Sequence, residues 1–171
     1  SDDGAVAFEI EAYDRSRPLV IEPYLIWATY LGGSATEAVR SVDADASGIY
    51  VTGETVSANF PVCTGVGTPV GCTGASFDTS QNGATDGFVT KLAPDGDALV
   101  YSTYVGGSDE DVLDDIVVRA GNAYVVGTSE STDYPTTAGV RGATKGGGTD
   151  VVVTQMSVDG ASLVDSTSVP G

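Results

Sequence analysis

Short runs rich in β-branched and aromatic residues, separated by Gly, Asp and Asn, recur along most of the chain. Such runs predict β-strands, and the pairs Asp95-Gly96 and Asp159-Gly160 predict tight hairpin turns. No segment keeps an apolar period of 3.6 residues, so we expect little helix. The expected strands cover Val39–Asp43, Ile49–Thr55, Gly87–Leu92, Leu99–Val105, Asp115–Arg119, Ala123–Ser129, Asp150–Ser157 and Leu163–Ser168.

The second half of the chain repeats the first. The run Thr29–Ser34 (TYLGGS) returns as Thr103–Ser108 (TYVGGS), an offset of 74 residues (29 to 103). The run Asp86–Leu92 returns as Asp150–Met156 at an offset of 64 residues (86 to 150), because the first copy alone carries an insertion around the two cysteines. Four antiparallel strands in each of two tandem copies are typical of β-propeller blades.

These motifs resemble the secreted β-propeller repeat family often called SBBP. The residues that carry the resemblance are TYLGGS, the Tyr-Val-x-Gly strands at Tyr50 and Tyr124, the Phe-Pro or Tyr-Pro loops at Phe60 and Tyr134, and the Phe-Val-Thr-Lys-Leu strand before Pro94. The resemblance spans about Leu25 to Gly171, and the residues before it are similar to the β-rich segment that precedes such repeats. It implies an extracellular or surface-anchored β-sheet protein.

The expected fold is all-β, with tandem four-stranded antiparallel propeller-type blades that do not close into a propeller on their own. Residues 1–33 are expected to form a leader hairpin (Ala5–Tyr13 with Pro18–Glu22) and the outer strand of a partial blade (Leu25–Leu31). Residues 34–108 form the first repeat with its disulfide insertion, and residues 109–171 form the second. Propellers close with about four to eight blades, so two blades leave faces and edges uncovered, which favours association with other chains.

The cysteines and the first residue of the chain bear on where the protein is located. Cys63 and Cys72 are the only cysteines, and the chain has no histidine, so they cannot complete a four-ligand metal site. We expect a disulfide between them, with two reduced thiols as the alternative. A disulfide and a start at Ser1 rather than Met favour a processed protein, extracellular or at the cell surface. The longest apolar stretch, Pro18–Leu31, is interrupted and too short to span a bilayer.

Charge and composition exclude several functions. The 24 acidic and 7 basic residues give a net charge of −17, which argues against nucleic-acid binding because phosphates would be repelled. An acidic surface of this kind stays hydrated in concentrated salt. The absence of histidine removes the Ser-His-Asp and Cys-His mechanisms. We expect no enzymatic activity. A carboxylate-dependent hydrolase is the remaining catalytic alternative, although with 24 acids some pair always lies at a workable distance.

Two groups of residues are candidate binding sites. The acids Asp109, Asp111, Asp114 and Asp115 could hold Ca²⁺, which takes oxygen ligands, and a solvated turn is the alternative. No other cofactor is expected. Trp27 is a candidate for stacking on a glycan. The tyrosines that recur with the repeat are expected to pack between blades instead, namely Tyr30, Tyr50, Tyr101, Tyr104, Tyr124 and Tyr134.

These features predict a non-enzymatic extracellular structural protein. We expect it to be the subunit of a homopolymer, a filament or surface layer, joined by β-strand addition or by blade-on-blade stacking. The alternative is a fragment of a larger secreted adhesin, whose loops Ala58–Asp86 and Thr132–Thr149 would bind a glycan or a protein.

Overall fold

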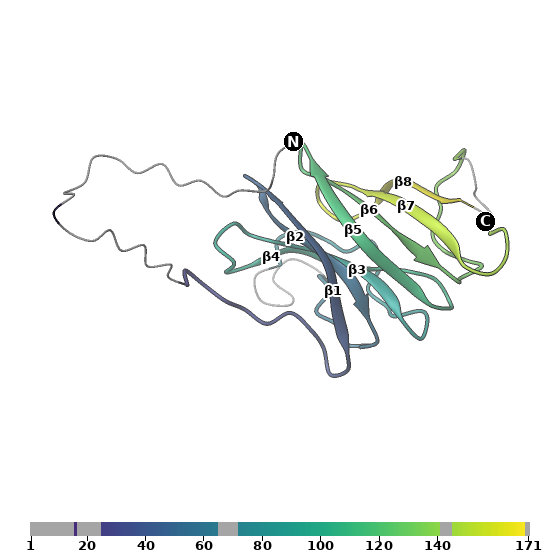
Figure 1. Cartoon of the computed structure of the whole chain (residues 1–171), viewed down its shortest axis with the longest axis horizontal. Helices are drawn as coiled ribbons and strands as arrows, with labels where there is room; N and C mark the ends of the chain where they lie inside the picture. Colours follow the sequence, from purple (N-terminus) through teal and green to yellow (C-terminus); the bar gives the residue numbers. More distant parts are fainter. Residues whose placement is uncertain (1–15, 17–24, 65–71, 141–144, 170–171) are drawn as a thin grey trace.

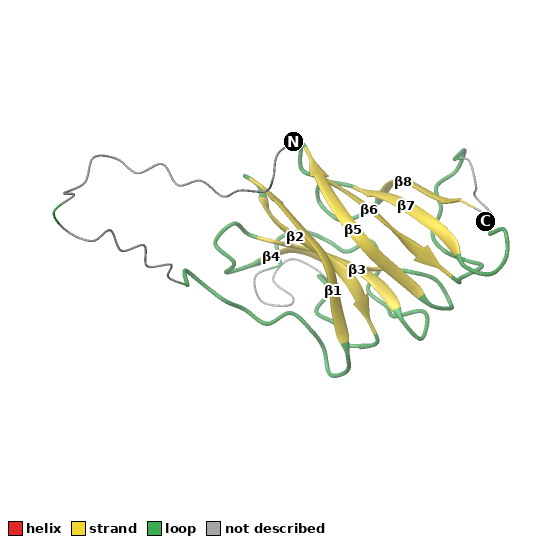
Figure 2. Ribbon diagram, viewed as in Figure 1, coloured by secondary structure: helices red, strands yellow, loops and turns green. Residues whose placement is uncertain are grey.

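The protein is built from two antiparallel β-sheets, one for each sequence repeat (Figure 1, Figure 2). The computed structural model describes residues 16, 25–64, 72–140 and 145–169, and within these it contains eight strands and no helix. The first blade contains β1 (Glu37–Asp45), β2 (Gly48–Thr55), β3 (Asp86–Leu92) and β4 (Leu99–Val105). The second contains β5 (Asp111–Arg119), β6 (Asn122–Ser129), β7 (Asp150–Met156) and β8 (Leu163–Val169). The all-β prediction is confirmed, as is the strand order, because each sheet follows the order of its strands in the sequence.

A β-bulge lengthens the first strand of each blade beyond the sequence prediction. The pairing register shifts between Val39 and Ser41 in β1 and between Leu113 and Asp115 in β5. The extra residue breaks the apolar alternation, so the pattern revealed only the second half of β5.

A glycine on the neighbouring strand accommodates each bulge. Gly53 pairs with Val39, and Gly127 pairs with Leu113. A Cβ added to either glycine would lie well within 3.0 Å of a backbone carbonyl oxygen on the bulged strand. The last residue of the Tyr-Val-x-Gly motif is therefore glycine because the bulged backbone approaches it closely.

The main hydrophobic core lies between the two sheets. Strand β5 contacts β1, β2 and β3, so the innermost strand of the second blade lies against the first blade (Figure 1). The rings of Tyr50 and Tyr101 meet edge to face at 6.4 Å, and both are fully buried. The core comprises Tyr50, Val89, Tyr101 and Val105 from the first blade and Leu113, Ile116, Val118, Ala123, Val125, Tyr134, Val152 and Met156 from the second. A smaller cluster within the first blade comprises Phe60, Val62, Phe88 and Tyr104.

The disulfide between Cys63 and Cys72 is confirmed, with Cα atoms 5.7 Å apart. On either side of it the chain runs along the free edge of β4. The Cys63 N–H donates to the Ser102 carbonyl at 3.0 Å, and the Gly74 N–H donates to the Val100 carbonyl at 2.7 Å. The insertion therefore covers backbone groups of an edge strand that would otherwise be open to pairing.

Removing the disulfide with a double substitution, Cys63→Ser with Cys72→Ser, should destabilise the first blade. The chain-entropy model assigns roughly 2.5–3 kcal/mol to closing a loop of about ten residues. Urea unfolding should show a correspondingly lower midpoint for the variant. The same midpoint for variant and wild type would contradict this expectation.

The described residues do not test the whole expectation for the N-terminal region. Leu25–Leu31 belongs to none of the strands that the structure describes. The predicted hairpin of Ala5–Tyr13 with Pro18–Glu22 lies outside the described residues. In the described part of the chain there is also no helix that could cross a membrane.

Candidate functional site

One surface of the first blade is exposed to solvent, although the equivalent surface of the second blade is buried. Leu113 and Ile116 on β5 are 0% and 5% exposed, because they pack against the first blade. Their counterparts on β1, 74 residues earlier (39 to 113), are Val39 and Val42, which are 60% and 61% exposed. We call the first-blade surface that carries Val39 and Val42 the upstream face. A hollow of about 190 Å³, lined in part by Tyr30, lies near the outer end of the same blade.

The second blade exposes a different surface, namely the one that in the first blade is buried against the second. In the first blade Val89 is fully buried against the second blade. Its counterpart Val153 is 41% exposed, and Val117 and Val126 beside it are 41% and 38% exposed. We call the second-blade surface that carries Val117, Val126 and Val153 the downstream face. These three valines and Tyr124 line a shallow hollow of about 150 Å³.

The contact between the two blades shows how the upstream and downstream faces can fit together. Inside the chain, a downstream-type surface of the first blade packs against an upstream-type surface of the second. The upstream face of the first blade and the downstream face of the second blade are the two surfaces of these types that the contact between the blades leaves exposed. A contact between different surfaces on two copies is heterologous, and it produces a ring or an open filament rather than a twofold dimer.

Each Gly-Gly-Ser sequence forms a hydrogen-bonded turn at the entry to its blade. In the second blade the Gly107 N–H donates to Asp111 Oδ2 at 2.6 Å, and the Ser131 hydroxyl donates to the same oxygen at 2.8 Å. The Ser108 N–H and hydroxyl both donate to Asp133 Oδ1. The first blade repeats this arrangement with Glu37, Ser57 and Asn59 in the corresponding positions. The TYLGGS motif therefore has a structural role, holding the first strand of each blade.

The four candidate calcium ligands do not come together. Asp111 is buried at the start of β5, whereas Asp109, Asp114 and Asp115 are exposed. The Asp115 carboxylate accepts a hydrogen bond from the Ser41 hydroxyl at 2.6 Å, across the two blades. Within the described residues, no three acidic, histidine or cysteine side chains lie close enough together to hold a metal ion. Calcium binding at these positions remains a prediction.

The sequence did not reveal a pair of buried carboxylates at the junction between the blades. Asp86 begins β3 and accepts hydrogen bonds from the N–H groups of Asn82 and Gly83 at 2.8 and 3.0 Å. Burial raises the pKa of both Asp86 and Asp111, and the negative charge of Asp111 further raises the pKa of Asp86. The recurrence of Asp86 as Asp150, at the start of the equivalent strand, was the available signal.

The raised pKa values predict that the variant Asp111→Asn is less sensitive to pH than the wild type. Unfolded aspartates ionise near pH 3.9, and the buried pair ionises at higher pH. Their ionisation therefore destabilises the fold as the pH rises from about 4 through the raised pKa values. Asparagine keeps an acceptor oxygen but cannot ionise. Urea midpoints should fall less between pH 4 and pH 7 for Asp111→Asn than for the wild type.

A matched control for this measurement is Asp109→Asn, which removes a carboxylate that is exposed. The control should retain the wild-type pH slope. Equal slopes for Asp111→Asn and Asp109→Asn would show that the buried carboxyl does not titrate in this range.

The aromatic candidates divide between the core and the surface. Tyr50, Tyr101, Tyr104 and Tyr134 are buried, Tyr124 is half-buried and Tyr30 is fully exposed. The Trp27 ring lies directly over Gly96 in the β3–β4 turn, where a Cβ would come within 3.0 Å of it. The Tyr101 ring lies over Gly160 in the β7–β8 turn in the same way. Trp27 therefore occupies a blade-packing position, and its stacking on a glycan remains a prediction.

Comparison with known proteins adds nothing to this geometry. No protein-family model matches the chain, and no curated protein matches it. The function is accordingly inferred from the two uncovered faces and the ends of the blades.

Proposed function

We propose that the protein is a non-enzymatic structural subunit that self-assembles head to tail into an extracellular homopolymer. The observation that carries this proposal is the difference between equivalent positions: Val39 and Val42 are 60% and 61% exposed, whereas their counterparts in the second blade are 0% and 5% exposed. The downstream face of one copy covers the upstream face of the next, as the first blade covers the second within each copy.

Burial of apolar surface supplies the driving force. Fully burying a valine or leucine side chain contributes about 1.5–3 kcal/mol relative to leaving it exposed. The two faces together expose five valines, each by 38% or more, namely Val39, Val42, Val117, Val126 and Val153. A repeated contact of this kind needs no enzyme or ligand.

Location and charge fit the same function. The Cys63–Cys72 disulfide is compatible with an oxidising compartment outside the cytosol. The net charge of −17 makes copies repel one another at low ionic strength. Salt screens this repulsion over a Debye length of about 10 Å at 0.1 M, so assembly should strengthen as salt is added. The resemblance to secreted β-propeller repeats supports the same location.

The proposal is tested by the size of the purified protein as a function of salt and protein concentration. Light scattering after size exclusion should show a mass that grows with both, and negative-stain microscopy should show filaments or layers of regular repeat. A particle of 17.3 kDa at every concentration and salt level would overturn the proposal.

A further inference from the structure

We propose that the copies join by strand exchange, in which residues Leu25–Leu31 of one copy replace β8 as the outer strand of the second blade of the preceding copy. This inference rests on the proposed self-assembly and names the contact that makes it. The partner is a second copy of this chain, and the backbone hydrogen bonds of β7 would provide the attachment.

Leu25–Leu31 already lies where the outer strand of a preceding blade belongs. Its sequence, LIWATYL, corresponds to the β4 sequence LVYSTYV, 74 residues later (25 to 99). Trp27 lies over Gly96 of the first blade as Tyr101 lies over Gly160 of the second. Leu31 packs against the first-blade cluster as Val105 packs in the main core. The segment thus makes the contacts of a preceding blade's outer strand, although no such blade is described.

The side of this segment that faces away from the first blade lacks cover. Tyr30 is 104% exposed, and Leu25 and Ile26 are each 79% exposed. None of the described strands pairs with the segment. An apolar, unpaired segment of strand-forming composition is a ready partner for a sheet edge.

Strand β8 is a weak version of the outer strand. At the position of Tyr101 and Trp27 it carries Asp165, and at the position of Tyr104 and Tyr30 it carries Ser168. In the first blade the Tyr104 hydroxyl donates to the Ser57 carbonyl at 2.7 Å and accepts from the Phe60 N–H at 3.0 Å. Ser168 is too short to make the equivalent contacts.

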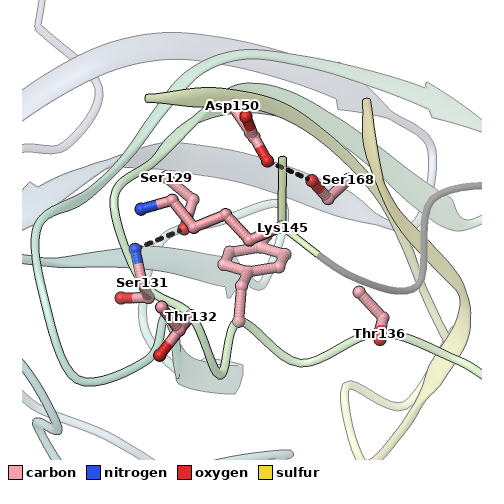
Figure 3. A pocket seen from close by; sticks show the side chains of 8 residues that line it. Ser129, Ser131, Thr132, Thr136, Lys145, Asp150 and Ser168 are labelled. Carbon is pink, nitrogen blue, oxygen red and sulfur yellow. Dashed lines mark hydrogen bonds between the residues drawn. The ribbon is translucent and has the colours of Figure 1, made fainter. Parts of the chain in front are cut away.

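A small cavity lies beside Ser168, which stands at the position of Tyr104 and has no ring. Ser168 lines a cavity of about 10 Å³ together with Ser129, Ser131 and Tyr134, and its hydroxyl donates instead to Asp150 (Figure 3). This space is near the minimum for one water molecule, so a phenol ring enters only when β8 leaves. Tyr30 from another copy would bring its hydroxyl to Ser131 and Tyr134, the counterparts of Ser57 and Phe60.

The edge of β8 is also less firmly held than that of β4. The disulfide-closed insertion hydrogen-bonds along β4 through both Cys63 and Gly74. Along β8, the backbone-to-backbone contact outside the sheet among the described residues is from the Thr137 N–H to the Ser166 carbonyl at 3.0 Å, and the Ser166 N–H donates to the Thr137 hydroxyl at 3.0 Å. Edge elements with few partners open at the lowest free-energy cost.

Exchange gains two aromatic side chains and loses the hydrogen bonds of the β8 side chains, including that of Ser168 to Asp150. In the exchanged register Thr29 takes the place of Thr167, opposite Val153 on β7, and Tyr30 takes the place of Ser168. Ala28 replaces Ser166, which gives up hydrogen bonds to Thr154 and to the Pro135 carbonyl. Burying Tyr30, which the free subunit exposes completely, favours the exchanged form.

A designed disulfide that locks β8 in place tests the exchange. Val153→Cys with Thr167→Cys joins two residues that pair across β7 and β8. The oxidised variant should stay monomeric under conditions in which the wild type assembles, and mild reduction should restore its assembly. The oxidised double variant is compared with the single variant Val153→Cys, which measures what changing this residue of the downstream face does to assembly by itself. The wild type under the same reductant is the second control, because reduction also reaches Cys63–Cys72.

A second variant, Thr29→Cys with Val153→Cys, places the two cysteines opposite each other only between exchanged copies. It should give a ladder of disulfide-linked multimers on a non-reducing gel. If the locked variant assembles like the wild type and no ladder forms, the exchange is overturned while head-to-tail stacking stands. If the wild type itself stays monomeric, both proposals fail.

Discussion

The substitution Gly127→Ala will destabilise the protein by about 3 kcal/mol, near the upper end of overpacking effects. The new Cβ would lie 1.9 Å from the Val112 carbonyl oxygen and 2.8 Å from the Leu113 Cα. Both atoms belong to the bulged backbone of β5, so no side-chain rotation relieves the clash. Either the bulge or the β5–β6 pairing has to change, and β5 is the strand that holds the second blade against the first.

This effect is measured by urea or thermal unfolding against Gly139→Ala. Gly139 has a φ of 85° and no atom within 4 Å of an added Cβ. Gly139→Ala thus measures the cost of a left-handed backbone without a clash, about 1–2 kcal/mol, and serves as a benchmark for the clash at Gly127, which has no positive φ. Gly53→Ala should behave like Gly127→Ala, because Gly53 faces the Ala38 carbonyl in the same way. A loss no larger than that of Gly139→Ala would show that the bulge relaxes easily.

The substitution Val42→Glu will abolish self-assembly while leaving the subunit folded. Val42 is 61% exposed in the single subunit, so a glutamate there stays solvated and changes stability by no more than about 0.5 kcal/mol. In the proposed stack it occupies the position of Ile116, which is 5% exposed. Burying an unpaired carboxylate costs several kcal/mol, and each 1.4 kcal/mol weakens association about tenfold.

The matched control is Val158→Glu, which adds the same charge in the β7–β8 turn at a residue that is 50% exposed and belongs to neither face. It should assemble almost as the wild type does. Because the contact is heterologous, Val42→Glu keeps a working downstream face. Small amounts mixed with wild-type protein should therefore cap filaments and shorten them. Normal filaments formed by Val42→Glu alone would contradict head-to-tail stacking through these faces.

Local chemistry explains why most strands could be predicted. The β-branched and aromatic runs and the Asp-Gly turns agree with the sheets, and Gly96 and Gly160 both have the positive φ of 73° that such turns favour. The bulges escaped prediction because an extra residue removes the period of two. Leu25–Leu31 belongs to none of the described strands, and propensity alone could not decide this because pairing also needs a neighbouring strand.

The site residues were harder to predict than the strands. The disulfide followed from the count of cysteines, since two residues allow one pairing. The acidic run suggested a single cluster, but the β-bulge between Leu113 and Asp115 interrupts the alternation of β5, so Asp111 is buried whereas Asp114 and Asp115 are exposed. The packing of Trp27 on Gly96 could not be predicted from the sequence, because the two residues are 69 positions apart (27 to 96).

The sequence alone determined that the protein is all-β, that it contains two copies of one four-stranded unit, and that the first copy carries a disulfide. These properties depend on local propensity, turn residues and the spacing of repeats. Only the tertiary structure decided which valines are covered and which are open. Val39 and Leu113 are apolar residues at equivalent positions, and the sole reason that one is exposed and the other buried is the presence of a neighbouring blade.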